Sequence, residues 1–268
     1  MKKSLLLGVL ILAQTAQAGS TEFVPLQERA QGRSLAGSTL LNDSLFANPA
    51  AAALTQVYAI DATALSTKDF AISILDTKTS SLGGGIAYYR MSRAGTDKAI
   101  QGAKLGVTSR LGQNFGVGLV GKMLWGPDLD GTNTRNTDLD FGVTSQFDFL
   151  QFGLSIHNLL GGHLPMGEVR EYSLGGRIGW EQTLFFSAAV SGTVSGLDPQ
   201  ELGFGAEYVS PYQFALKGGF RTRPAESASY WSTGVSILSP KLSLHYALEI
   251  PNQGTGGLEH TFGTTVLF

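Results

Sequence analysis

The chain has 268 residues, 35 glycines, no cysteine and a formal net charge of −2. The lack of cysteine excludes disulfides and thiolate metal sites, and the nearly balanced charge argues against a nucleic-acid partner. A mean hydropathy of only +0.07 is typical of a chain in which apolar and polar side chains alternate.

Residues 1–18 have the features of a signal peptide. Lys2 and Lys3 precede a short apolar run, Leu5 to Ala13, and Ala16-Gln17-Ala18 forms a small-x-small cleavage site. The apolar run is too short to cross a bilayer. We therefore expect an exported protein whose mature chain begins near Gly19, and not a lipoprotein, because no cysteine follows the site.

Residues 19–54 differ in pattern from the rest of the chain. They show no alternation, and Pro49 restricts Asn48 to an extended or turn conformation. Apolar residues recur too often for a good linker. We predict a plug that enters the lumen of a barrel, and the alternative is a disordered linker.

From Gln56 onward the sequence becomes a series of fourteen alternating runs, each close to the length of a tilted membrane strand. An even number of strands is typical of bacterial outer-membrane barrels. The pattern predicts an all-β fold, a transmembrane antiparallel β-barrel of about 14 strands over residues 55–268. The runs are 56–65, 69–77, 81–91, 100–110, 114–124, 138–148, 149–158, 170–179, 183–194, 201–210, 212–221, 228–237, 241–250 and 257–268.

The lengths of the joins indicate the orientation of this barrel. Joins after even-numbered runs are tight, as at Gly112–Gln113, and joins after odd-numbered runs are longer and polar, with the short join at 66–68 as the exception. Tight turns of such barrels face the periplasm and long loops face outward. The first strand should therefore begin, and the last strand end, on the periplasmic side. A soluble sandwich, which is the other interpretation, has no reason to alternate short and long joins in this way.

Parity also assigns side chains to the two faces. Leu242, Leu244 and Tyr246 should face lipid, because a charge at mid-bilayer costs a few kcal/mol. Charged residues of the opposite parity should face the lumen and pair across it. This predicted network consists of Lys104, Arg110, Lys122, Asp140, Arg177, Glu181, Glu207, Lys217 and Glu249.

The final run has the features of a closing strand. Leu258, Phe262, Val266 and Phe268 share one parity, and small or polar residues share the other. The terminal Phe268 is similar to the assembly signal that barrel-assembly machinery reads.

The segment that contains Asp43-Ser44, Phe46 and Asn48-Pro49-Ala50 resembles the N-terminal signature of the FadL superfamily. That family comprises outer-membrane transporters of long-chain fatty acids and PorV/PorQ-like relatives. The resemblance implies a fourteen-stranded barrel plugged by its N-terminus. The expected outer loops are short, so the chain looks like a compact member without the loop-built capture groove of the transporters.

The glycine run Gly83-Gly84-Gly85 opens the third strand. Consecutive glycines permit a kink or bulge, and a kink in the third strand forms the side opening of FadL transporters. We therefore interpret this run as a lateral opening. The alternative is that the glycines let plug side chains approach the wall.

Three other patterns carry no predicted chemistry. The four histidines lack ligand spacing, a Ser243–His245 pair has no evident orienting acid, and the loop from Asp128 to Asn133 lacks the closing acidic residue of a calcium site. We expect no cofactor, no metal and no enzymatic activity.

Three functions remain open from the sequence. The first is a FadL-like barrel that passes hydrophobic small molecules or lipids across the outer membrane. The second is a PorV-like barrel that anchors or shuttles a secreted protein, and the third is a small general porin. A soluble periplasmic enzyme is the alternative outside this class. Outer-membrane lipid and the barrel-assembly machinery are the expected partners in each barrel interpretation.

Overall fold

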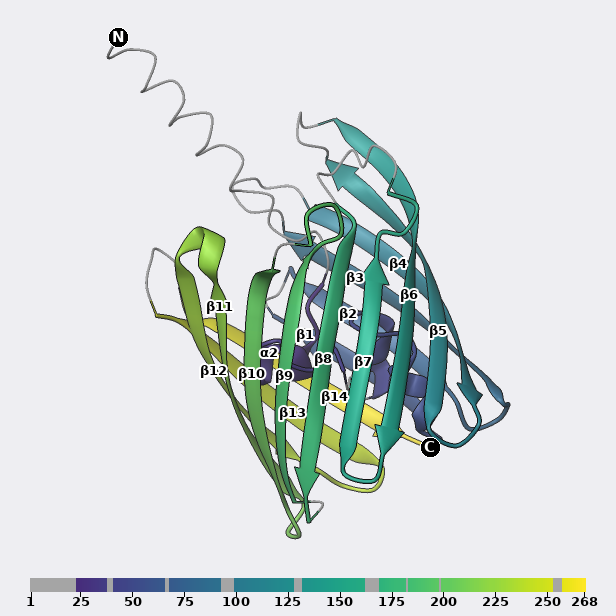
Figure 1. The fold of residues 1–268 in the computed structure, drawn as a ribbon, viewed down its shortest axis with the longest axis vertical. Helices are drawn as coiled ribbons and strands as arrows, with labels where there is room; N and C mark the ends of the chain where they lie inside the picture. Colours follow the sequence, from purple (N-terminus) through teal and green to yellow (C-terminus); the bar gives the residue numbers. More distant parts are fainter. Residues whose placement is uncertain are drawn as a thin grey trace.

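The computed structural model describes residues 23–37, 41–65, 68–92, 99–127, 132–161, 169–181, 183–197, 199–252 and 257–268, so the predicted signal peptide lies outside the described residues. Within these ranges, fourteen strands form a closed barrel (Figure 1). Each strand pairs antiparallel with its neighbours in the chain, and β1 pairs with β14 to close the ring. No helix among the described residues has the length and apolar character needed to cross a bilayer.

The fourteen predicted runs all form strands. The largest difference is at β6, which begins at Asn133 and not near 138, because its ladder with β5 continues to the pair Pro127–Asn133. The added residues are polar and partly exposed on both faces, so no alternation marks them. The strands are β1 Tyr58–Ala64, β2 Phe70–Asp76, β3 Leu82–Ser92, β4 Ala99–Leu111, β5 Phe115–Pro127, β6 Asn133–Phe147, β7 Leu150–His157, β8 Glu171–Trp180, β9 Leu184–Thr193, β10 Pro199–Ser210, β11 Phe214–Arg223, β12 Ala228–Ile237, β13 Leu242–Pro251 and β14 Glu259–Leu267.

The two faces of the strands differ sharply in exposure. On β14, Phe262 is 59% exposed and its neighbour Thr261 only 1%; on β4, Leu105 is 64% exposed and Lys104 only 2%. The exposed side carries Phe, Leu and Val around the whole ring. An apolar surface of this extent is stable in contact with lipid and not with water. The predicted alternation of lipid-facing and lumen-facing residues is therefore confirmed.

The described N-terminal segment, residues 23–37 and 41–54, runs inside the barrel (Figure 1). It contains α2 Leu26–Ala30 and the 3₁₀ turns η2 Leu41–Leu45 and η3 Ala51–Leu54; a further turn, η4 Pro224–Glu226, joins β11 to β12. The segment's backbone touches the inner wall at glycines, because a Cβ on Gly118 would overlap the backbone of Pro49 and one on Gly219 would overlap that of Gln31. The glycines of the inner face thus make room for this segment.

A matched pair of alanines tests the assignment of faces. Ala188 and Ala189 are adjacent on β9; Ala188 is exposed on the outer face, whereas Ala189 lines an interior pocket. We expect Ala188→Lys to lower the free energy of unfolding in lipid vesicles by about 2–4 kcal/mol, as a cation near mid-bilayer does. Ala189→Lys should cost less, because its ammonium reaches a polar lumen. Equal losses in denaturant titrations of the two variants would contradict the assignment.

Candidate functional site

Three groups of buried ion pairs cross the interior. In the first, Glu201 on β10 accepts from Arg33 of the N-terminal segment at 3.5 Å and from Arg221 and Arg223 on β11 at 3.2 and 2.7 Å. Arg221 also pairs with Glu249 on β13 at 2.5 Å. This group therefore ties the N-terminal segment to one side of the wall.

The second group surrounds Asp140 on β6. Its carboxylate lies 3.4 Å from the Lys104 ammonium, 2.9 Å from that of Lys122 and 3.5 Å from Nδ1 of His157. The main-chain N–H of Asn158 donates to the same carboxylate. All these side chains are buried, so the lysines and the aspartate are held within one strongly interacting cluster.

The third group joins Glu207 on β10 to Arg177 at 2.5 Å and to Lys217 at 3.6 Å. Of the nine residues of the predicted network, seven thus lie in these groups. Arg110 and Glu181 do not. Arg110 is exposed and donates to the carbonyl of Gln113 in its own turn, and Glu181 is an exposed turn residue with φ of 51°. Arg110 still pairs with Gly116 but lies at the exposed end of β4, and Glu181 follows the last residue of β8, so neither side chain reaches the buried part of the lumen.

The predicted network omitted five members of these groups, namely Arg33, His157, Glu201, Arg221 and Arg223. The last three share the inward parity of their strands, so the alternation could have identified them. Arg33 lies in the N-terminal segment, where no periodicity assigns a direction to a side chain.

An aromatic cluster lies between the N-terminal segment and the inner wall. The ring centroids of Phe23 and Phe46 are 5.5 Å apart, and Tyr89 on β3 lies 6.0 Å from the first and 5.8 Å from the second. Ile100, Val120 and Leu124 of β4 and β5 complete the same buried apolar cluster. The interior therefore has one side, on β3–β5, where this apolar cluster lies beside the buried Lys104 and Lys122, and another, on β8–β13, whose buried side chains form the other two groups of ion pairs.

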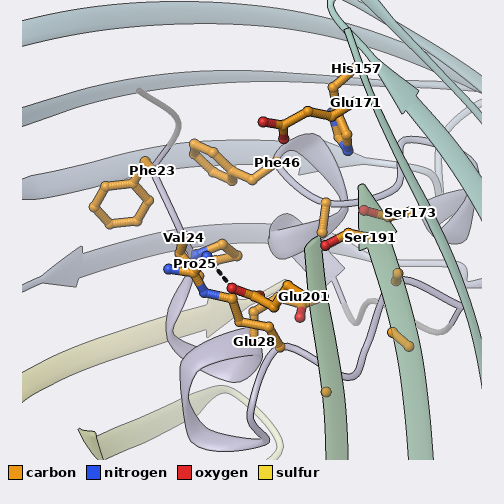
Figure 2. A pocket seen from close by; sticks show the side chains of 15 residues that line it. Phe23, Val24, Pro25, Glu28, Phe46, His157, Glu171, Ser173, Ser191 and Glu201 are labelled. Atoms are coloured by element: carbon orange, nitrogen blue, oxygen red, sulfur yellow. Dashed lines mark hydrogen bonds and ion pairs between the residues drawn. The ribbon is translucent and has the colours of Figure 1, made fainter. Parts of the chain in front are cut away.

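A pocket of about 110 Å³ opens where these two sides meet (Figure 2). Phe23 and Phe46 lie on one side of it, and Glu28, Glu171 and Glu201 supply carboxylates (Figure 2). Its walls come from the N-terminal segment and from β7–β10. The lining residues are Phe23, Val24, Pro25, Glu28, Arg33, Ala36, Phe46, Ala47, His157, Glu171, Ser173, Ala189, Ser191, Glu201 and Gly203.

A second, more polar pocket of about 100 Å³ adjoins the first and shares four of its lining residues, Arg33, Glu171, Ser191 and Glu201. It adds Gln200, Arg223 and Glu226, which lie where β10 begins and β11 ends. This is the end of the barrel at which the longer joins lie. The two pockets together lead from the long-loop end to the aromatic side chains Phe23 and Phe46.

Glu28 is the most unusual polar group of the inner pocket. Its side chain is buried, Oε2 accepts from the main-chain N–H of Leu35 at 3.3 Å, and Oε1 has no hydrogen-bond partner among the described residues. Burial raises the pKa of Glu28 to about 7, because the charged form loses its hydration. Both protonation states of this carboxyl group are therefore populated at neutral pH.

A third pocket, of about 810 Å³, lies at the opposite, short-turn end of the barrel. It is lined by Ala51, Leu54 and Thr55 of the N-terminal segment and by residues of the β6–β7 and β8–β9 turns. The N-terminal segment thus borders an open space at each end of the lumen.

The residues of the N-terminal signature dock this segment on β5 and β6. Asn48 donates from Nδ2 to the carbonyls of Ala36 at 3.0 Å and Val143 at 3.2 Å, and its Oδ1 accepts from Ala50 N at 3.0 Å. Pro49 lies against Gly118, and Ala50 is fully buried. The signature therefore acts as a structural anchor for the segment.

The ladder of β3 with β4 keeps an unbroken register through Gly83, Gly84 and Gly85, and the ladder with β2 runs without a shift as far as Gly84. A Cβ on Gly85 would lie 3.1 Å from the methyl carbons of Leu45 in η2. The glycines therefore give Leu45 access to the wall, and no bulge interrupts either ladder; the lateral opening stays a prediction. At the other end of the chain, Phe268 donates its N–H to Tyr58 and packs on its ring at 5.2 Å, at the closing seam; its role as an assembly signal stays a prediction.

Among the described residues, no group of three or more His, Asp or Glu side chains could hold a metal ion. No protein-family model and no curated protein matches the chain. Solved structures do match. The toluene transporter TbuX of Ralstonia pickettii aligns with a TM-score of 0.69 at 13% identity, over 92% of this chain and 97% of that one.

Two other matches extend this comparison. The toluene transporter TodX of Pseudomonas putida aligns with a TM-score of 0.69 at 10% identity, over 90% of this chain and 96% of that one. A FadL homologue of Pseudomonas aeruginosa aligns with a TM-score of 0.59 at 12% identity, over 93% and 99% of the two chains. The chain therefore has the fold of FadL-type outer-membrane transporters, and the resemblance found in the sequence is confirmed at the level of the fold.

Removing the Asn48 side chain should loosen the N-terminal segment. Asn48→Ala leaves buried carbonyls of Ala36 and Val143 without this donor, which costs about 1–3 kcal/mol. We expect trypsin to cleave the folded variant in detergent at Arg29 or Arg33 while the barrel stays intact, and to leave these two largely buried sites of the wild type uncut. Asn252→Ala, which removes an exposed asparagine on the long-loop side, is the control. Unchanged protection in both variants would show that Asn48 does not hold the segment.

Proposed function

We propose that this protein is an outer-membrane channel for small hydrophobic molecules, in which residues 19–54 act as a plug, residues 55–268 form the barrel and residues 1–18 are the cleaved signal peptide. The observation that carries the proposal is the pair of adjoining pockets that leads from the long-loop end to Phe23 and Phe46. Under this proposal the long-loop end faces outward and the large short-turn pocket is a periplasmic vestibule. The structurally similar TbuX and TodX are described as toluene transporters.

The size of the inner pocket suits a small molecule. At about 110 Å³ it is somewhat smaller than an apolar protein cavity of about 150 Å³ that binds benzene. Transfer of apolar surface from water to such a site contributes roughly 25 cal/mol per Å². A single-ring compound that binds against Phe23 and Phe46 would therefore extend into the adjoining pocket of about 100 Å³.

The onward step requires a movement of the plug. The segment contains only short helices and is held by side-chain contacts, among them Arg33–Glu201 and Arg29–Glu259, the latter at 2.5 Å. Such an element opens at a lower free energy than the ladder does. We propose that displacement of part of the plug opens a route onward from the two adjoining pockets. This route leads either to the vestibule or, if β3 separates locally from its neighbours at Gly83–Gly85, to the side of the barrel.

An anchoring role is the second candidate function. The unbroken β3 ladder and the N-terminal segment that occupies the lumen are also what a barrel needs if it only attaches a secreted protein to the outer membrane. The two roles differ in flux, because an anchor has no need for a path through its interior.

Substitution of Phe46 decides between these roles. In cells that express the wild type, we expect faster uptake of radiolabelled toluene than in cells without the protein. Phe46→Asp replaces an aromatic ring of the inner pocket with a carboxylate and should reduce this uptake at least tenfold, since an apolar ligand loses its contact with the ring and meets a charged group instead. Tyr212→Asp changes an aromatic residue of an exposed turn and should leave uptake unchanged. If the wild type adds no uptake, transport is refuted and the anchoring role remains.

A further inference from the structure

We infer that the inner pocket selects apolar molecules that carry one uncharged hydrogen-bonding group, such as a phenolic hydroxyl, over plain hydrocarbons and over carboxylates. The inference rests on the proposed channel function and specifies its substrate class. It comes from the polar groups of the pocket, which an apolar channel would not require.

Glu28 is the first of these groups. Its side chain is 5% exposed, it lines the pocket, and its Oε1 lacks a hydrogen-bond partner among the described residues. A hydrocarbon that fills the pocket would leave this oxygen desolvated and unpaired, which disfavours binding. A hydroxyl group removes that penalty, because it donates to the ionised carboxylate and accepts from the protonated form.

The acidic residues of the lining explain the discrimination against anions. Glu28, Glu171 and Glu201 all line the pocket, and like charges repel at this range in a poorly hydrated site. The basic residues of the lining are Arg33 and His157, and each already has an acidic partner, since Arg33 pairs with Glu201 at 3.5 Å and Nδ1 of His157 lies 3.5 Å from Asp140. A bound carboxylate would therefore meet three acidic groups and no basic group that lacks an acidic partner.

The aromatic wall supplies the other half of the recognition. Phe23 and Phe46 border the pocket, and the Glu171 side chain extends toward Phe46 (Figure 2). A ring placed against these side chains would direct one substituent toward the carboxyl groups. The pocket thus has an apolar half and a hydrogen-bonding half, and its volume admits about one ring.

Three single-ring compounds test the inference, namely toluene and its para-hydroxyl and para-carboxylate derivatives, p-cresol and p-toluate. Binding to the full-length protein in nanodiscs is measured by saturation-transfer NMR, with empty nanodiscs subtracted. We expect the wild type to bind p-cresol about tenfold more tightly than toluene and p-toluate most weakly. Glu28→Gln keeps a hydrogen-bonding group and should retain the preference. Glu28→Leu should abolish it, with toluene bound at least as tightly as p-cresol.

The controls separate this inference from the channel proposal. Glu181→Leu, at an exposed turn on the other end of the barrel, should leave the order of affinities unchanged. Equal binding of p-cresol and toluene by the wild type, or tighter binding of p-toluate, overturns the inference without any variant. If those compounds nevertheless bind in a manner that Phe46→Asp abolishes, the channel proposal stands. If none of the three binds and none is taken up by cells, the channel proposal itself is wrong.

Discussion

The need to pair every backbone N–H and C=O in lipid is the constraint on which the rest of this structure depends. An unpaired group in hydrocarbon costs several kcal/mol, so strands can cross a membrane only as a closed ring. Here the ladder between β1 and β14 supplies that closure, from the pair Ala59–Leu267 to the pair Ala64–Phe262. Once the ring is closed, every strand has one face toward lipid and one toward the lumen, and the period of two follows from this geometry.

A fourteen-stranded ring leaves an interior too wide for its own side chains to fill. The N-terminal segment occupies much of this space, and the inner glycines allow its backbone to approach the wall, as at Gly118 and Gly219. Buried arginines and lysines then need partners, since an unpaired buried charge is very costly. The three groups of ion pairs meet this requirement, and the one built on Glu201 includes Arg33 of the segment itself. The same ion pairs therefore both fill the lumen and hold the N-terminal segment in place.

The regular part of this arrangement could be predicted from the sequence. Alternation located all fourteen strands and the inward positions of Lys104, Asp140 and Glu207, because a half-buried strand must alternate. The prediction failed at the ends of strands, because Arg110 lies at the exposed end of β4, Glu181 lies in a turn, and the first residues of β6 are exposed or partly exposed on both faces. The pocket could not be predicted, because Glu28, Phe46, His157 and Glu201 are far apart in the chain. They meet only through the path of an N-terminal segment that has no periodicity.

The outer face of the barrel therefore determines that the protein sits in a membrane, whereas the interior determines what it can bind. The lipid-facing residues tolerate many apolar side chains, since they need only avoid charge, and this explains how chains of 10–13% identity keep one fold. The interior has no such freedom, because each buried polar atom depends on a particular partner. A buried carboxyl group such as Glu28, with one oxygen that accepts from the N–H of Leu35 and another without a hydrogen-bond partner among the described residues, is a costly feature in a purely structural plug. Under the proposed channel function, its place in the lining beside Phe23 and Phe46 is explained by a ligand that completes its hydrogen bonding and then leaves.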